Sequence, residues 1–165
     1  MRRISILAWI ATLVLAVLPS APTAAAPRCY PNNRFVVLTG GMVQDTLTQL
    51  VWQQDGSATR AGCNGTGNLT CTWAEAQAYC AALSLGGLSG WRLPTYKELS
   101  SIVDFAVAYP GPTINQAAFP STPSEGFWTS SPYAHRSGNA WGVSFNFGIA
   151  DWSLVSLNKR VRCVR

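Results

Sequence analysis

Hydrophobic and polar positions divide the chain into an apolar leader and a patterned remainder. An apolar run, 4–18, follows Arg2 and Arg3, and the small residues Ala24–Ala26 come after it. A basic start, an apolar run and small residues are the layout of a secretory signal peptide, which we expect at residues 1–26. The run is shorter than the about 20 residues that a membrane helix needs. We therefore expect an exported protein, periplasmic, envelope-bound or secreted, with no membrane span after cleavage.

The remainder predicts a short leader at 27–33 and one domain at 34–165, a length that suits a single core. Short apolar stretches between turn residues predict strands. We expect strands at 35–38, 42–44, 50–52, 127–129, 140–147, 149–154 and 159–164. Gly, Asn, Ser and Thr dominate 55–70, which predicts a loop, and 113–125 is also irregular.

Two capping boxes predict two helices between the groups of strands. Thr72 with Glu75 begins a helix that runs to about Leu83, and Thr95 with Glu98 begins the second. Helical spacing predicts buried faces. These faces are Trp73, Ala76, Cys80 and Leu83 in the first helix and Leu99, Ile102, Val103 and Ala106 in the second. Strands, two helices, long loops and further strands indicate the α+β class.

Five cysteines change this picture, because cysteines of exported proteins usually pair. Cys63 and Cys71 bracket part of the long loop, so a bridge between them would staple it. The inward position of Cys80 suits a buried disulfide. The odd count leaves one cysteine over, and Cys29, near the mature N-terminus, is the best candidate to be free or to link two molecules. With a single histidine, His135, and no Cys-x-x-Cys motif, a metal site is not expected.

The residues needed for catalysis are poorly represented. Only His135 is available as the base of a serine hydrolase, and Gly87–Trp91 lacks the last glycine of a nucleophile elbow. Glycoside hydrolysis needs two carboxylates flanking the bond, which Asp45, Asp104 and Asp151 supply only if the fold brings them together. No phosphate-binding or calcium-binding loop motif is present. We expect no enzymatic activity and no cofactor.

Charge points to a binding role. The net charge is +5, and it falls to +3 when Arg2 and Arg3 leave with the signal peptide. The excess gathers near the C-terminus, where a basic cluster can attract polyanions. The ligand-binding candidates are Arg136, Lys159, Arg160, Arg162 and Arg165. An ordinary solvated strand explains the C-terminal cluster equally well. The basic excess is small and no nucleic-acid-binding motif accompanies it, so nucleic acid is not expected as a partner.

Tryptophans are frequent, and most lie in periodic apolar patterns that favour core packing. Trp152 differs, because the polar residues Asp151 and Ser153 flank it. An exposed tryptophan ring stacks well on a sugar ring.

An ordered set of motifs resembles the Lcl C-terminal domain family, which is named for a collagen-like adhesin. The resemblance extends from about Arg34 to Arg165. The motifs are Asp45, Leu50-Val51-Trp52, Trp73 with Ala76, Tyr79-Cys80, Trp91-Arg92-Leu93-Pro94-Thr95, Glu98-Leu99, Phe119-Pro120, Phe127-Trp128-Thr129-Ser130-Ser131, Ala140-Trp141 and Val161-Arg162-Cys163-Val164-Arg165. The Trp-Arg-Leu-Pro-Thr run is also similar to a turn in formylglycine-generating enzymes and related C-type-lectin-like domains.

The resemblance implies a C-type-lectin-like fold, with two helices on short, mostly antiparallel sheets, and a bridge between Cys80 and Cys163. The namesake domain binds sulfated glycosaminoglycans and helps cells attach to surfaces. This chain has no collagen-like Gly-X-Y region, no Glu-Pro-Asn or Trp-Asn-Asp motif of calcium-dependent lectins, and no match to the reactive cysteines of formylglycine-generating enzymes.

These observations together predict a secreted or envelope module that binds an anionic, sulfated glycan or a surface protein in adhesion. Two alternatives stay open. The first is a structural or assembly module, an oligomer linked through Cys29 or through an exposed strand edge. The second is an envelope enzyme of a type that the sequence does not identify.

Overall fold

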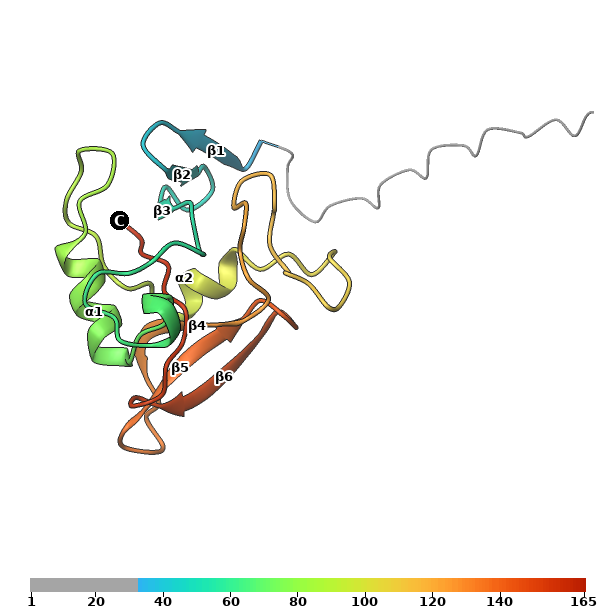
Figure 1. Ribbon diagram of the computed structural model, residues 1–165. Coiled ribbons are helices and arrows are strands. Elements are labelled where there is room, and N and C mark those ends of the chain that lie inside the picture. The colour runs from blue at the N-terminus through green and yellow to red at the C-terminus, as the bar shows by residue number, and fades with distance from the viewer. Residues whose placement is uncertain (1–32) are drawn as a thin grey trace, which may run out of the picture.

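A computed structural model describes residues 33–165 of the protein (Figure 1). The predicted signal peptide at 1–26, nearly all of the leader at 27–33, and Cys29 lie outside the described residues and stay predictions. Within residues 33–165 no helix is both long enough and apolar enough to cross a membrane.

The first sheet holds three short antiparallel strands. They are β1 (Phe35–Leu38), β2 (Met42–Asp45) and β3 (Val51–Gln53), in the order β1-β2-β3. The β1–β2 turn contains Gly40 and Gly41, both with φ of 78°, a conformation that glycine adopts without steric cost. Val43 and Trp52 are paired across β2 and β3, and both are fully buried. This sheet therefore contributes one apolar layer to the core.

The second sheet is larger and is also antiparallel. It consists of β4 (Gly126–Pro132), β5 (Asn139–Ser144) and β6 (Ile149–Leu154), in the order β4-β5-β6. The β5–β6 hairpin turns at residues 145–148, where Gly148 has φ of 70°. Figure 1 shows this sheet below the first, with β6 along its outer edge. A short 3₁₀ helix, η1 (Thr66–Asn68), lies in the predicted 55–70 loop.

Both predicted helix starts are confirmed. Helix α1 (Trp73–Ala82) begins after Thr72, and α2 (Tyr96–Ser101) begins after Thr95, each with a complete capping box. Each threonine hydroxyl accepts from the glutamate N–H three residues on, and each glutamate carboxylate accepts from the threonine N–H. Two orphan amides are satisfied at each start, which fixes where the helices begin.

The second helix is shorter than its apolar pattern predicts. Helical spacing extended to Ala106, but α2 ends at Ser101. Ile102 and Val103 are still buried, but Val103 forms a β-bridge with Ile114. The Asp104 N–H then donates to the Thr113 carbonyl, 2.8 Å away. Pairing with the 113–114 backbone replaces the helix at two β-branched residues, which favour extended backbone.

The predicted strand at 159–164 is wrong as a regular element. This C-terminal segment, residues 159–165, instead forms isolated bridges to Cys71, Phe127, Trp52 and Arg92. The last residue, Arg165, exchanges two backbone hydrogen bonds with Val51, at 2.8 and 2.9 Å. In Figure 1 the segment runs from the second sheet up to the first. It therefore joins the two sheets.

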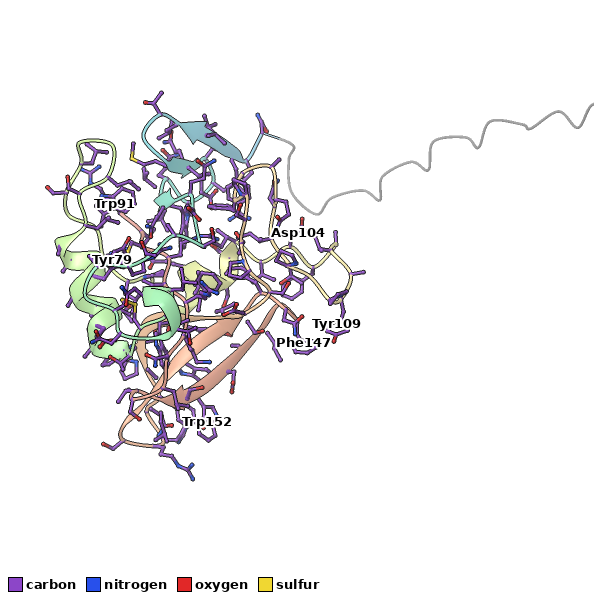
Figure 2. The ribbon with its side chains drawn as sticks, viewed as in Figure 1. Tyr79, Trp91, Asp104, Tyr109, Phe147 and Trp152 are labelled. Atoms are coloured by element: carbon purple, nitrogen blue, oxygen red, sulfur yellow. A yellow bond between two sulfur atoms is a disulfide. The ribbon has the colours of Figure 1, made fainter. Side chains whose placement is uncertain are left out.

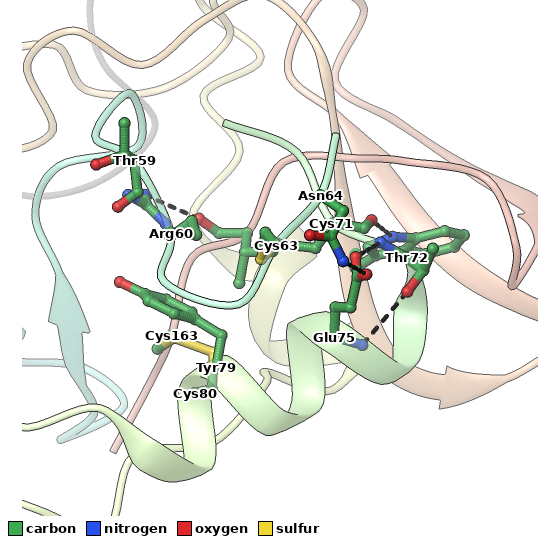
Figure 3. The surroundings of a disulfide bond; sticks show 12 residues. Thr59, Arg60, Cys63, Asn64, Cys71, Thr72, Glu75, Tyr79, Cys80 and Cys163 are labelled. Atoms are coloured by element: carbon green, nitrogen blue, oxygen red, sulfur yellow. Dashed lines mark hydrogen bonds between the residues drawn. A yellow bond between two sulfur atoms is a disulfide. The ribbon is translucent and has the colours of Figure 1, made fainter. Parts of the chain in front are cut away.

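Two disulfides reinforce this arrangement. Cys63 pairs with Cys71 across the long loop, and Cys80 of α1 pairs with Cys163 of the C-terminal segment. Figure 3 shows both bridges on the same side of α1. The predicted α+β class, with two helices, small antiparallel sheets and disulfide staples, is confirmed.

The core forms two adjoining clusters. One lies between the sheets and α2 and includes Trp52, Leu99, Phe127 and Phe145. The other surrounds the Cys80–Cys163 disulfide beside α1. Trp73, which the helical spacing placed in the core, is half-buried, and its indole N–H donates to the Thr129 carbonyl at 2.7 Å. The aromatic side chains that remain exposed among residues 33–165 are Tyr96, Phe105, Tyr109, Phe147 and Trp152.

Candidate functional site

A continuous group of aromatic side chains lies on one face of the second sheet. We call Tyr96, Tyr133, Trp141 and Trp152 the aromatic array. Tyr96 stacks on Trp141, with ring centroids 5.5 Å apart, and Tyr133 stacks on Trp152 at 5.2 Å. Tyr133 also meets Trp141 edge to face at 5.1 Å. Both contact types are favourable arrangements of aromatic pairs, so the four rings form one connected unit.

Strand register and a helix start bring these rings together. Trp141 of β5 is directly opposite Trp152 of β6, so both project from the same face. Tyr133 follows β4, and its N–H donates to the Asn139 carbonyl at 2.9 Å. Tyr96 is the first residue of α2, where its N–H donates to Ser131 Oγ at 3.0 Å. Trp141 and Trp152 are therefore placed by strand register, and Tyr96 and Tyr133 by hydrogen bonds of their own backbone N–H groups.

The array is accessible, and it retains unused hydrogen-bonding groups. Tyr96 is 37% exposed. Trp152, at the lower end of the second sheet in Figure 2, is 39% exposed. The indole N–H groups of Trp91 and Trp128 donate to carbonyls inside the protein. Those of Trp141 and Trp152 donate to no acceptor within residues 33–165, nor do the hydroxyls of Tyr96 and Tyr133. A ligand with hydroxyl or anionic oxygens can accept from them.

A cationic side chain, Arg136, lies against the array. The guanidinium of Arg136 lies over the Trp152 ring, 5.2 Å from its centroid, and Arg136 itself is exposed. His135 is also exposed and contacts Tyr133 edge to face at 5.7 Å. Lys97 is exposed next to Tyr96 on the first turn of α2. The border therefore favours a ligand that carries negative charge.

The acidic residue nearest in sequence to Tyr96 is already neutralised. Glu98 forms a bidentate pair with Arg92, at 2.7 and 2.8 Å. The Arg92 hydrogen bonds outweigh desolvation by burial and lower the pKa of Glu98 to about 2. Asp151 neighbours Trp152 in sequence, but alternation along β6 directs it to the opposite face. Neither carboxylate offsets the positive border of the array.

The structure does not support Arg162 as a ligand contact. This residue is fully buried, and its guanidinium carbon lies 4.7 Å from the centroid of the Phe119 ring, with Phe127 and Phe145 also within 6 Å. One of its nitrogens donates to Thr122 Oγ1 at 2.8 Å. Burial lowers the pKa of Arg162 to about 9, so the group stays charged at neutral pH. It is a core cation, held by rings and neutral acceptors.

The other C-terminal cations lie in three different settings. Arg160 is paired with Glu125 in two hydrogen bonds of 2.9 Å, and only 12% of its side chain is exposed. Lys159 is half-buried over the Trp128 ring, and this burial lowers its pKa. Arg165 is exposed, but its backbone pairs with Val51 of the first sheet. The predicted basic cluster is therefore not one surface, and of the predicted residues only Arg136 borders the aromatic array.

The three carboxylates considered for glycoside hydrolysis are used locally or stand apart. Asp45 is fully buried and forms a bidentate pair with Arg34. Asp104 is also buried, and its carboxylate accepts from the Ala106 N–H at 3.0 Å. Asp151 lies on the edge strand of the other sheet. Among residues 33–165, no three His, Cys, Asp or Glu side chains gather as they would around a metal ion.

A shallow pocket of about 290 Å³ lies beside α1 and offers little chemistry. Its polar groups are those of Tyr79 and Glu75. The Tyr79 hydroxyl accepts from the Gln53 amide at 2.9 Å, and the Glu75 carboxylate accepts from Thr72 and Asn64 (Figure 3). Because both groups are occupied inside the protein, the aromatic array is the stronger candidate site.

Sequence reasoning identified only part of this site. Trp152 was singled out by its polar neighbours and Arg136 by its charge. Tyr96, Tyr133 and Trp141 were not singled out as site residues. The signal available for Trp141 was its place in the strand predicted at 140–147, next to the strand predicted at 149–154. Antiparallel pairing of the two puts Trp141 opposite Trp152, with both side chains on one face.

The chain matches the family model of the Lcl C-terminal domain over residues 41–165. It belongs to the Lcl C-terminal domain family. The match includes both disulfides, both capping boxes and every member of the aromatic array. A comparison with curated proteins finds no match. The two disulfides suit an oxidising environment outside the cytoplasm.

Proposed function

We propose that the protein is a non-enzymatic binding module of the cell exterior or envelope, and that it binds an acidic glycan in adhesion. The ligand binds on the aromatic array, with Arg136 as the principal cation. The observation that carries this proposal is the aromatic array at the surface, where Tyr96 is 37% and Trp152 39% exposed, with the Arg136 guanidinium 5.2 Å from the centroid of the Trp152 ring. The signal peptide predicted at 1–26 supports the location.

Each part of the site has a counterpart in an acidic sugar chain. Sugar rings are apolar on their faces and bear hydroxyl groups on their edges, so aromatic surface and free donors suit them together. Tyr96 and Trp152 provide exposed aromatic surface, and the unused N–H and O–H groups of the array provide donors. The Arg136 guanidinium can bind a carboxylate or sulfate through charge-assisted hydrogen bonds. The namesake domain of the family binds sulfated glycosaminoglycans, which is consistent with this ligand class.

The test is retention of the purified protein on immobilised heparin as the salt concentration rises. We expect steep loss of retention between low and physiological salt, because exposed charge pairs are screened over that range. Arg136→Gln and Tyr96→Ala should each weaken binding, by about ten-fold for the charged residue. Arg165→Gln is the matched control, because it removes an exposed arginine outside the array.

The outcomes separate the array from the C-terminal cations. Equal losses for Arg136→Gln and Arg165→Gln would show general charge attraction and remove the array from the site. No retention of the unchanged protein at low salt would contradict the proposed binding of a sulfated glycan and would favour a protein partner. Charge reversal at Arg162 is not a useful test, because its burial makes the change a folding defect.

A further inference from the structure

The second sheet has one covered edge and one open edge. At the covered edge, the Trp128 N–H of β4 donates to the Arg160 carbonyl, and the Arg160 N–H donates to the Gly126 carbonyl, both at 2.9 Å. At the other edge, β6 pairs only with β5 within residues 33–165. Its outward N–H and C=O groups form a template for another strand.

Strand β6 lacks the usual protection of an edge. It contains no lysine and no proline, and Asp151 is its one charged residue. Three of its apolar side chains are well exposed, Ile149 at 54%, Trp152 at 39% and Leu154 at 53%. Its register with β5 runs without interruption through all six residues. Charges, prolines and bulges are the features that normally keep edge strands from pairing.

We infer that β6 pairs antiparallel with β6 of a second copy of this chain, around a two-fold axis at Trp152. The occupant of the edge is thus the protein itself. This inference goes beyond the proposed function, because it rests on the strand edge and not on the ligand.

The sequence of β6 selects the register. In a two-fold antiparallel pair, one residue must face its own copy, since otherwise paired side chains would lie on opposite faces. Within Ile149–Leu154, an axis at Asp151 or at Trp152 gives the longest pairing, about five residues a strand. An axis at Asp151 places two carboxylates directly opposite, which is destabilising.

The remaining register is self-complementary. With the axis at Trp152, each Asp151 is opposite Ser153 of the other copy, and each Ala150 is opposite Leu154. The hydroxyl can then donate to the carboxylate, and apolar side chains meet on the other face. A polar pair and an apolar pair of directly opposite residues each stabilise an antiparallel sheet modestly.

Strand β1, the outer strand of the first sheet, is less suited to this role. Strand β1 has four residues, so a two-fold pairing there joins about three residues a strand. Residues 1–32, which lead into β1, lie outside the part of the chain that the structure describes. Strand β6 is the longer edge, and its contacts are fully described.

Pairing at β6 would have a consequence for binding. The two second sheets would form one sheet of six strands, with both aromatic arrays on the same face. A polymeric ligand that reaches both arrays then binds the second one at a high effective concentration. Multivalency would thus arise without the collagen-like region that the sequence lacks.

The test is sedimentation equilibrium of protein expressed from the full sequence, over a range of concentrations. We expect a monomer–dimer equilibrium. Ser153→Asp places an acid opposite Asp151 of the other copy, twice in each dimer, and should weaken the dimer at least ten-fold. Ser153→Lys places a cation there and should tighten it several-fold. Ser84→Asp, an exposed serine after α1, is the matched control and should change nothing.

Opposite shifts from two substitutions at one position cannot come from misfolding alone, and the melting temperature of each variant checks the fold. A protein that stays monomeric at its highest soluble concentration would overturn the inference. So would a dimer that neither Ser153 variant changes, which would place the interface elsewhere. Ser153 is outside the aromatic array, so heparin retention by a monomeric protein would leave the proposed function standing.

Discussion

Three arginines of this protein, Arg136, Arg160 and Arg162, lie in two contrasting regions. In the C-terminal segment, Arg162 lies inside the core against three phenylalanine rings, and Arg160 is paired with Glu125. Beside the second sheet, Arg136 lies exposed over Trp152. The first region uses cations to hold the fold, and the second leaves a cation available to a ligand. The difference shows that charge density along a sequence does not locate a binding surface until the backbone contacts are known.

The largest effect on stability should come from removing the disulfide that holds the C-terminal segment to α1. Replacing Cys80 and Cys163 with serine should lower the free energy of unfolding by roughly 4 to 5 kcal/mol, because the bridge closes a long loop. Replacing Cys63 and Cys71 should cost roughly 2 to 3 kcal/mol, because that loop is short. The sequence separations are 83 and 8 residues. Denaturant unfolding of the two double variants measures both free-energy losses. Equal losses would contradict the larger stabilising role given to the Cys80–Cys163 bridge.

A single core arginine should have the next largest effect. Arg162→Ala removes ring contacts and leaves a cavity, so we expect a loss of about 3 kcal/mol of unfolding free energy. Arg136→Ala should change stability by less than about 0.5 kcal/mol, because the residue is exposed. Thermal or denaturant unfolding of both variants makes the comparison. A larger loss at Arg136 would reverse the roles given to the two regions.

Acid should weaken the Arg92–Glu98 pair at the start of α2, the helix that carries Tyr96 of the array. Because the pKa of Glu98 falls to about 2 in the folded protein from 4.5, its stabilising effect is present above pH 4.5 and is lost as the pH falls from 4.5 to 2. The partly exposed partner, Arg92, limits the effect to about 1 to 2 kcal/mol. Unfolding measured across this range should show a slope that Glu98→Gln reduces. An unchanged slope in Glu98→Gln would show that the Arg92–Glu98 pair does not contribute to the free energy of unfolding.

We expect the smallest effect at Arg160, whose exposure lies between that of the buried Arg162 and that of the exposed Arg136. Its pair with Glu125 is half solvated, so Arg160→Gln should cost up to about 1 kcal/mol of stability. Retention on heparin should stay within two-fold of the unchanged protein, as an approximate bound. Ten-fold weaker retention, as expected for Arg136→Gln, would return Arg160 to the ligand-binding set.

Local rules predicted much of the fold. The capping boxes at Thr72 and Thr95 placed both helix starts, because their hydrogen bonds join residues close in sequence. The apolar runs predicted as strands at 140–147 and 149–154 correspond to β5 and β6, although β5 ends at Ser144. The end of α2 was missed, because the backbone of Thr113 competes for Asp104. The C-terminal segment was missed as well, since its apolar pattern does not reveal that it bridges four separate parts of the chain.

The site was harder to predict for the same reason. Arg162 and Arg136 are chemically identical in the sequence, and only the packing of Phe119, Phe127 and Phe145 distinguishes them. The array joins Tyr96 to Trp141, which are far apart in sequence, through a helix start and a strand. No local pattern carries that information.

The hydrogen bonds between Val51 and Arg165 bear on how the protein is made. The first sheet gains this backbone partner only after synthesis has reached Arg165, so a growing chain holds β3 without its neighbour. Contacts between residues so distant in sequence form slowly. We therefore expect β3 to become resistant to proteases only after Arg165 has paired with it.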